Sequence, residues 1–278
     1  IGLLGELVSM GTLLAFATVC IGVLILRKTR PDLARPFRVP FAWFVCIAGA
    51  AACLYLFWQP FREHWTLMVG WTVIGTCRDP SRADALLAAG VEPFLWPADL
   101  APSLARATHV LASAAPDAAG DPFLQVAGDD LRAANPAWVG YLSTTAVYGD
   151  HQGGWVDETT PVTPGSARAH QRVLAESQWL DTGLPVHIFR LAGIYGPGRG
   201  PFEKVRDGSA RRIIKPGQVF SRIHVADIAE TLIASIAQPN PGAIYNLCDD
   251  DPAPPEDVLS YAAHLLGLPE PPAVPYDQ

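Results

Sequence analysis

Two long runs without charge near the start of the chain constrain its fold most strongly. Residues 7–26 and 39–61 contain no Asp, Glu, Lys or Arg. The first run would make about 30 Å of α-helix, which matches the hydrocarbon thickness of a bilayer. Apolar runs of this length are unusual in water-soluble folds. We therefore expect two transmembrane helices, with a pair of buried core helices as the alternative.

The segment between the two runs sets the expected orientation. Residues 27–38 carry five basic side chains against Asp32 alone. A short basic loop stays on the cytoplasmic side, so this loop should be cytoplasmic and residue 62 should emerge outside. The next uncharged stretch, residues 64–77, is 14 residues long and too short for an ordinary third span.

The segment "ELVSMGTLLAFATVCIGVLILRKTRPDLARPFRVPF" resembles the C-terminal region of cationic-type amino-acid permeases. The resemblance covers about residues 1–75, and it extends to the motif between the two helices. Such permeases bind their substrate between discontinuous helices near the start of their fold, and this chain has no such elements. Residues 1–70 are therefore interpreted as a membrane anchor.

The pattern changes after residue 70 to short apolar strands that alternate with helices. Strands separated by helices of this length indicate a parallel, doubly wound α/β sheet. Strands are expected at 71–77, 91–96, 107–115, within 138–149 and at 185–196, and helices at 81–90, 120–134 and 166–183.

Composition excludes some classes of function. The net charge is −7, and the part after residue 70 has no basic stripe, so a nucleic-acid partner is not expected. The five cysteines show no paired metal-ligand spacing, and we predict no metal site. The chain begins with Ile1, so we expect a fragment or an internal start. A signal peptide is not expected, because no basic n-region or small-residue cleavage site is apparent.

Several motifs after residue 70 resemble the extended short-chain dehydrogenase/reductase family, the NAD-dependent epimerase/dehydratase-like group. They are "YLSTTAVYGDHQGGWVDETTPVTP", "FRLAGIYGPGRG", "SRIHVADIAETLIASI" and "AIYNLCDDDPAP", and they occur in the family's order. The resemblance covers nearly all of residues 71–278. It implies a small-molecule substrate bound beyond the carboxyl ends of the strands, where doubly wound sheets bind ligands.

The resemblance also assigns roles to individual residues. Thr144 would bind a substrate hydroxyl or carbonyl group, Arg78 would meet the 2′-phosphate of NADP, and Asp99 would lie near the adenine. The predicted site comprises catalytic Thr144, Tyr148 and Arg172, cofactor-binding Arg78, Asp99 and Ser143, and substrate-binding Thr145, Tyr195, Arg199, Arg222 and His224. The alternatives are strand-end capping for Ser143, Thr144 and Thr145 and a solvated loop charge for Arg78.

The catalytic pair departs from the family pattern. The family uses Tyr-x-x-x-Lys on one helix, and the matching positions here are Arg168 and Arg172. An arginine is always protonated, so Arg168 cannot replace the tyrosine as general acid and base. Arg172 could still hold a ribose or a phosphate.

The start of the α/β fold departs as well. A dinucleotide site needs a first strand and a G-x-G-x-x-G loop, and no such motif precedes residue 71. "GPGRG" at 196–200 follows a late strand, and no matching helix is expected after it. The sheet should therefore lack its first strand, and binding of NADP or NAD should be weak or lost.

We divide the chain into a transmembrane segment at 1–70 and an incomplete Rossmann-like domain at 71–278. The leading hypothesis is a membrane-tethered NAD(P)-dependent oxidoreductase/epimerase-like domain with impaired or no hydride transfer, cytoplasmic if it keeps its family setting. The alternatives are a non-catalytic module that binds a nucleotide-sugar or another small ligand, and a permease fragment. The two halves could also be a natural fusion or an artefact of sequence assembly.

Overall fold

The computed structural model describes residues 71–96 and 98–276, together with Thr29, Ile47, Ala51 and Tyr55. Apart from those four residues, the two predicted membrane runs and the basic loop lie outside the described residues. None of the helices in the described part is long and apolar enough to cross a membrane.

The chain divides into two compact units between Trp96 and Pro97. The described part of the first unit is a parallel pair of strands, β1 with β2, in which Val73 lies opposite Val91. Two short helical segments connect the strands. The elements are β1 (Val73–Cys77), η1 (Pro80–Arg82), α3 (Ala83–Ala88) and β2 (Val91–Leu95).

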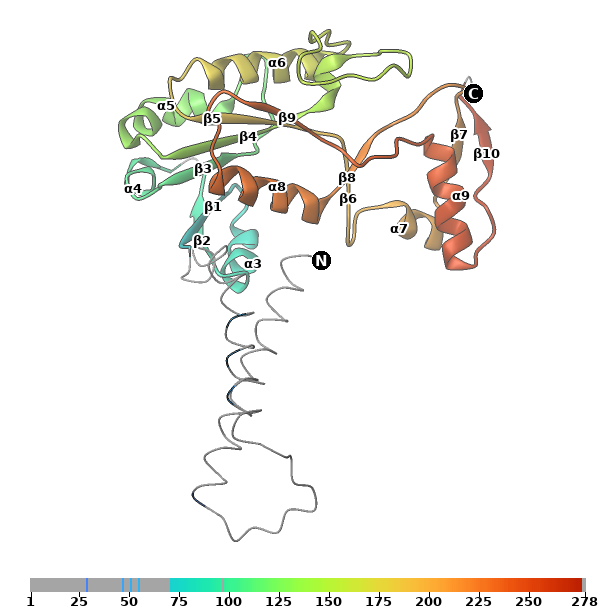
Figure 1. The fold of residues 1–278 in the computed structure, drawn as a ribbon, viewed down its shortest axis with the longest axis horizontal. Helices are drawn as coiled ribbons and strands as arrows, with labels where there is room; N and C mark the ends of the chain where they lie inside the picture. The colour runs from blue at the N-terminus through green and yellow to red at the C-terminus, as the bar shows by residue number, and fades with distance from the viewer. Residues whose placement is uncertain are drawn as a thin grey trace. The chain divides into compact units, whose positions relative to one another are not determined.

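The second unit is built on a four-stranded parallel sheet with the order β3-β4-β5-β9. Helices α5 and α6 cover one face of this sheet, and α8 covers the other (Figure 1). The strands are β3 (His109–Ala112), β4 (Trp138–Thr144), β5 (Val186–Leu191) and β9 (Ile244–Leu247). The helices are α4 (Ala101–Leu104), α5 (Pro122–Ala134), α6 (Ala167–Leu180) and α8 (Val225–Ala237), and η2 (Thr145–Tyr148) follows β4.

Two small parallel pairs complete the second unit. β6 (Gly193–Tyr195) pairs with β8 (Arg222–His224), and β7 (Arg212–Ile214) pairs with β10 (Ala273–Pro275). Helices α7 (Pro201–Arg206) and α9 (Pro255–Leu266) pack against each other beside β7 and β10 (Figure 1).

The parallel α/β architecture predicted from the sequence is confirmed. Within residues 71–96, β1 pairs with β2. Within residues 98–276, the main ladder is β3-β4-β5-β9, in which β3 pairs with β4.

The core beneath α8 depends on a glycine in β4. Trp138 is 2% exposed, stacks on His187 with ring centroids 5.5 Å apart, and donates from Nε1 to Ser235 Oγ at 3.1 Å. A Cβ atom at Gly140 would lie 2.2 Å from the Trp138 ring. Residues two apart in a strand share a face, so the indole can lie flat only over a residue without a side chain.

The opposite face of the sheet contains a buried ion pair. Arg190 in β5 and Glu176 in α6 are each 4% exposed. Arg190 Nη2 donates to Glu176 Oε2 at 2.7 Å, Arg190 Nε donates to Oε1 at 3.2 Å, and Ser143 Oγ also donates to Oε1. Three donors therefore satisfy a carboxylate that water does not reach.

We predict that Gly140→Ala destabilises the protein by about 1–3 kcal/mol, because the new methyl group overpacks the core against Trp138. Gly128→Ala is the matched control, since a Cβ there meets no atom closer than 3.7 Å. Gly128 lies inside α5, so its replacement should stabilise by about 0.5–1 kcal/mol. Urea unfolding of the full chain measures both changes, and equal effects would contradict the packing argument.

We predict that Glu176→Gln destabilises by about 3–5 kcal/mol, because it leaves the Arg190 charge buried without a counter-charge. Asp129→Asn removes one carboxylate from the surface pair with Arg132, where the Asp129 side chain is 98% exposed. That control should cost less than about 1 kcal/mol. A loss for Glu176→Gln no larger than the control's would show that the buried pair is not important for stability.

Candidate functional site

The carboxyl end of β4 carries the predicted catalytic segment. Thr144 Oγ1 accepts from Ala146 N at 3.2 Å and caps η2, which agrees with the capping alternative. Thr145 Oγ1 donates to the Leu191 carbonyl at 3.5 Å, at the end of the neighbouring strand β5. Both threonines are half-buried. They are therefore placed where doubly wound sheets bind ligands, and their predicted roles stay predictions.

Tyr148 is enclosed by hydrogen bonds. Its hydroxyl accepts from Arg190 Nη1 at 2.8 Å and donates to Asn246 Oδ1 at 2.8 Å, and the side chain is buried. The Arg190 guanidinium also lies over the Tyr148 ring, 4.9 Å from its centroid. The tyrosine, in η2 directly after β4, therefore connects this segment to β5 and β9. Its hydroxyl proton is donated to Asn246.

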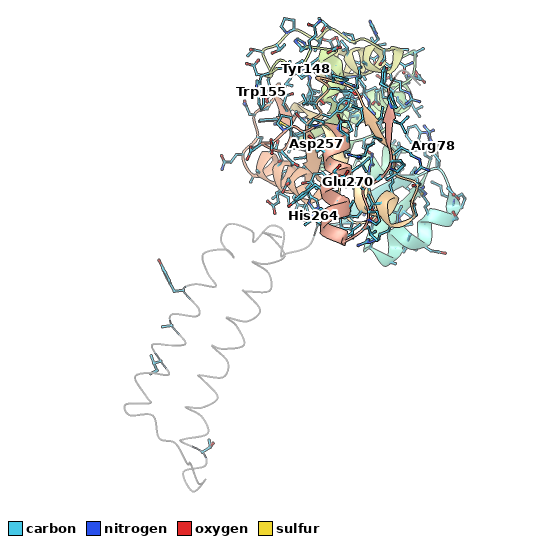
Figure 2. All side chains as sticks on the ribbon, turned by 90° about the vertical axis from the view of Figure 1, so that its right-hand side faces the viewer. Arg78, Tyr148, Trp155, Asp257, His264 and Glu270 are labelled. Carbon is cyan, nitrogen blue, oxygen red and sulfur yellow. The ribbon has the colours of Figure 1, made fainter. Side chains whose placement is uncertain are left out.

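The loop at 149–163 contacts Tyr148 and Asn246 through two of its side chains. Thr163 Oγ1 donates to the Tyr148 carbonyl, and Glu158 accepts from Asn246 N at 2.7 Å. Gly149 has φ +78°, and a Cβ there would lie 2.1 Å from the Thr163 carbonyl oxygen, so this close return requires glycine. Trp155 between these contacts is 79% exposed, whereas Tyr148 is buried (Figure 2).

The two arginines at the Tyr and Lys positions lie on α6 and differ in their surroundings. Arg168 is exposed. Arg172 is half-buried, and its Nη1 donates to Leu142 O at 2.9 Å, to Tyr141 Oη at 3.0 Å and to Ala114 O at 3.4 Å. Burial raises the pKa of Tyr141 to about 12, against the opposing effect of Arg172. The Tyr141 hydroxyl therefore stays protonated at neutral pH.

A second group of predicted residues lies at the ends of β6 and β8. The rings of Tyr195 and His224 meet edge to face at 5.1 Å. Burial raises the pKa of Tyr195, and a hydrogen bond to Asp249 adds to the effect. A cleft of about 430 Å³ lies alongside, lined by residues of α8, β9 and the following loop, including Asp227 and Asp249. Its acidic lining disfavours a phosphate group there.

The other predicted residues are not gathered around one point. Ser143 is buried and bonded to Glu176, so its hydroxyl already has a protein partner. Arg222 donates to the carbonyls of Phe220 and Ala253, and Arg199 is exposed on a turn. Arg78 is exposed in the first unit, whereas Asp99 is exposed in the second and caps Ala101 N at 3.0 Å.

The segment at 196–200, for which no matching dinucleotide-type helix is predicted, is followed by the short helix α7. Gly196 and Arg199 form an isolated bridge, and α7 begins at Pro201. This helix has only six residues, and its Gly200 cap makes no side-chain hydrogen bond. The turn therefore closes off β6, and it does not begin a long helix as a dinucleotide loop does.

Sequence reasoning missed four residues that organise the site: Tyr141, Glu176, Arg190 and Asn246. Arg190 interrupts the apolar strand "VHIFRL", and a charge in a buried strand needs a partner. Glu176 follows Arg172 by one helical turn on the same face of α6. Together these two signals could have suggested the ion pair, but the sequence does not show that Tyr148 completes it.

The residues present do not fit a complete dinucleotide site. The sequence has no G-x-G-x-x-G motif. Arg78 lies in the first unit and Asp99 in the second, and both side chains are exposed. What remains at the carboxyl edge of the second unit is Arg172 and the polar residues of β4.

No protein-family model matches the sequence. A stretch of 76 residues is 41% identical to the methylthioribose transporter of Bacillus subtilis, and it covers 27% of this chain and 16% of the transporter. The chain spans less than half the length of the curated relatives it matches, for example 47% of one of them.

Solved structures match a larger share of the chain. A dTDP-glucose 4,6-dehydratase from Bacillus anthracis, solved in complex with NAD, has a TM-score of 0.61 and 16% identity over 77% of this chain and 79% of its own. This likeness shows that the fold is that of the NAD-dependent epimerases and dehydratases.

A conserved protein of unknown function from Silicibacter pomeroyi is far closer in sequence. It is 61% identical, with a TM-score of 0.72, and the match covers 75% of each chain. That identity over three quarters of both chains is well beyond a shared fold. The chain therefore belongs to the same family as the Silicibacter pomeroyi protein.

Proposed function

We propose that residues 71–278 form an NAD(P)-dependent oxidoreductase/epimerase-like domain in which hydride transfer is weak or lost. The observation that carries this proposal is the identity of the residues on α6 at the positions of the family's Tyr-x-x-x-Lys pair. Arg168 and Arg172 occupy the positions of the family's tyrosine and lysine, and Arg172 Nη1 is bonded to Leu142 O and Tyr141 Oη. Neither guanidinium can accept and return a proton near neutral pH.

The nearby hydroxyls do not replace the missing general acid and base. The Tyr148 hydroxyl donates to Asn246 and accepts from Arg190, and its side chain is buried. Tyr141 has a pKa raised to about 12, chiefly by burial, so it holds its proton across the physiological range. A positioned general acid and base contributes about 10²–10⁴-fold to a rate, and we expect that contribution to be absent.

We predict that the purified full chain shows no substrate-dependent oxidation of NADPH or NADH with a panel of nucleotide sugars. Absorbance at the nicotinamide band measures the reaction. Substrate-dependent oxidation that disappears in Thr144→Ala, and persists in the exposed control Thr159→Ala, would contradict the proposal.

A second candidate is a non-catalytic module that binds a nucleotide-sugar. The bonds that already engage Ser143 and Tyr148 favour it, because they make the carboxyl edge rigid without leaving a group poised for proton transfer. Calorimetry separates the two candidates. Binding of a nucleotide sugar without turnover supports the module, whereas turnover supports the enzyme.

We also propose that the domain is tethered to a membrane through residues 7–26 and 39–61. The lengths of these apolar runs and the basic loop between them support the tether. The 76-residue similarity to a transporter agrees with it.

We predict that the full chain sediments with membranes and resists extraction by carbonate, whereas deletion of residues 1–70 moves the protein to the supernatant. Leu14→Arg should weaken insertion, because a centrally placed arginine costs about 2.5–3.5 kcal/mol on insertion scales. Full-length protein that stays in the supernatant would reject the tether. Immunoblotting of the fractions gives the measurement.

A further inference from the structure

The guanidinium of Arg172 is bonded along one edge only. Its three internal hydrogen bonds, to Leu142 O, Tyr141 Oη and Ala114 O, all come from Nη1. Within the described residues, Nε and Nη2 donate to no protein acceptor, and no carboxylate lies within ion-pair distance. Arg190 differs, because Nε, Nη1 and Nη2 all have partners and Glu176 balances its charge.

This one-sided bonding leaves a fixed cation that has no ion-pair partner within the described residues. Arginine presents donors in a planar fork that matches the oxygens of a phosphate or a carboxylate. Holding Nη1 on the two carbonyls and the tyrosine hydroxyl orients the fork. The Tyr141 hydroxyl oxygen accepts from Arg172 Nη1 at 3.0 Å. The open Nε–Nη2 edge is therefore preorganised for an anion.

Arg168 adds a second positive charge on the same side of α6. It precedes Arg172 by four residues, and side chains at this spacing lie one above the other on a helix. Arg168 is exposed, and no hydrogen bond or ion pair engages it within the described residues. Because both arginines are always charged, the pair is selective for anions at any physiological pH.

We propose that Arg168 and Arg172 form an anion site at the amino-terminal half of α6 that binds the diphosphate of a phosphorylated ligand. Arg172 holds one phosphate through its Nε–Nη2 edge, and Arg168 neutralises the other. The inference rests on the proposed function, since it names the ligand class for that same site. It gives the two arginines a binding role at the positions where the family has its proton-transfer pair.

Calorimetric titration of the purified full chain with inorganic pyrophosphate tests the proposal. Arg172→Lys keeps the charge but loses the fork, and it should weaken binding about 10- to 100-fold, the usual range for charge-assisted hydrogen bonds. Arg168→Met should weaken binding about 2- to 5-fold, as expected for an exposed charge. Raising the salt concentration should weaken binding to the wild-type chain, because salt screens the exposed charge of Arg168.

Arg132→Met is the matched control, since it removes an arginine on α5 that pairs only with Asp129 on the surface. It should leave pyrophosphate binding unchanged. The proposal is overturned if the wild-type chain does not bind pyrophosphate, if both α6 variants bind as the wild type does, or if Arg132→Met weakens binding equally. Arg168 makes no internal bond, so Arg168→Met stays interpretable even where Arg172→Lys unfolds.

Two displacement titrations identify the ligand and separate this proposal from the proposed function. Displacement of pyrophosphate by NAD indicates a dinucleotide, and displacement by dTDP-glucose indicates a nucleotide sugar. Failure of both to displace it overturns the assignment to a diphosphate ligand. Turnover of NADPH together with arginine-dependent pyrophosphate binding would reject only the proposed function. If the wild-type chain neither binds pyrophosphate nor turns over NADPH, only the anion site is rejected.

Discussion

The buried ion pair between Arg190 and Glu176 connects more parts of the second unit than any other contact described above. It links the middle of β5 to α6, and Ser143 extends it to β4. Arg190 also donates to Tyr148, which donates to Asn246 in β9. A buried charge pair is expensive to desolvate, so such a pair is tolerated only where its remaining donors and acceptors are satisfied. Here Ser143 in β4 and Tyr148 in η2 provide the additional contacts.

This network stabilises the geometry of the carboxyl edge. The order β3-β4-β5-β9 places β4 and β5 in the middle of the ladder, and the ion pair lies between those two strands and α6. The contacts of Tyr148 and Glu176 therefore depend on the two strands that have a ladder partner on both sides.

The sequence predicted the alternation of strands and helices well, because the apolar periods and the Gly and Pro boundaries are local signals. Helix α5 and the start of α6 agree closely with the predicted ranges 120–134 and 166–183. The strand order β3-β4-β5-β9 within the second unit was not predicted. Strand pairing depends on residues far apart in the chain, which local periodicity does not report.

The roles assigned to the candidate site residues stay predictions, and the structure adds their hydrogen-bond partners. Tyr148 is held by Arg190 and Asn246, two residues within the quoted motifs to which no role was assigned. A hydroxyl that completes a buried network cannot easily be a reactive group, because moving its proton would break the network that positions it. The same reasoning favours Arg172 as a binding group. Its Nη1 is held by three internal acceptors, and within the described residues its Nε and Nη2 donate to no protein acceptor.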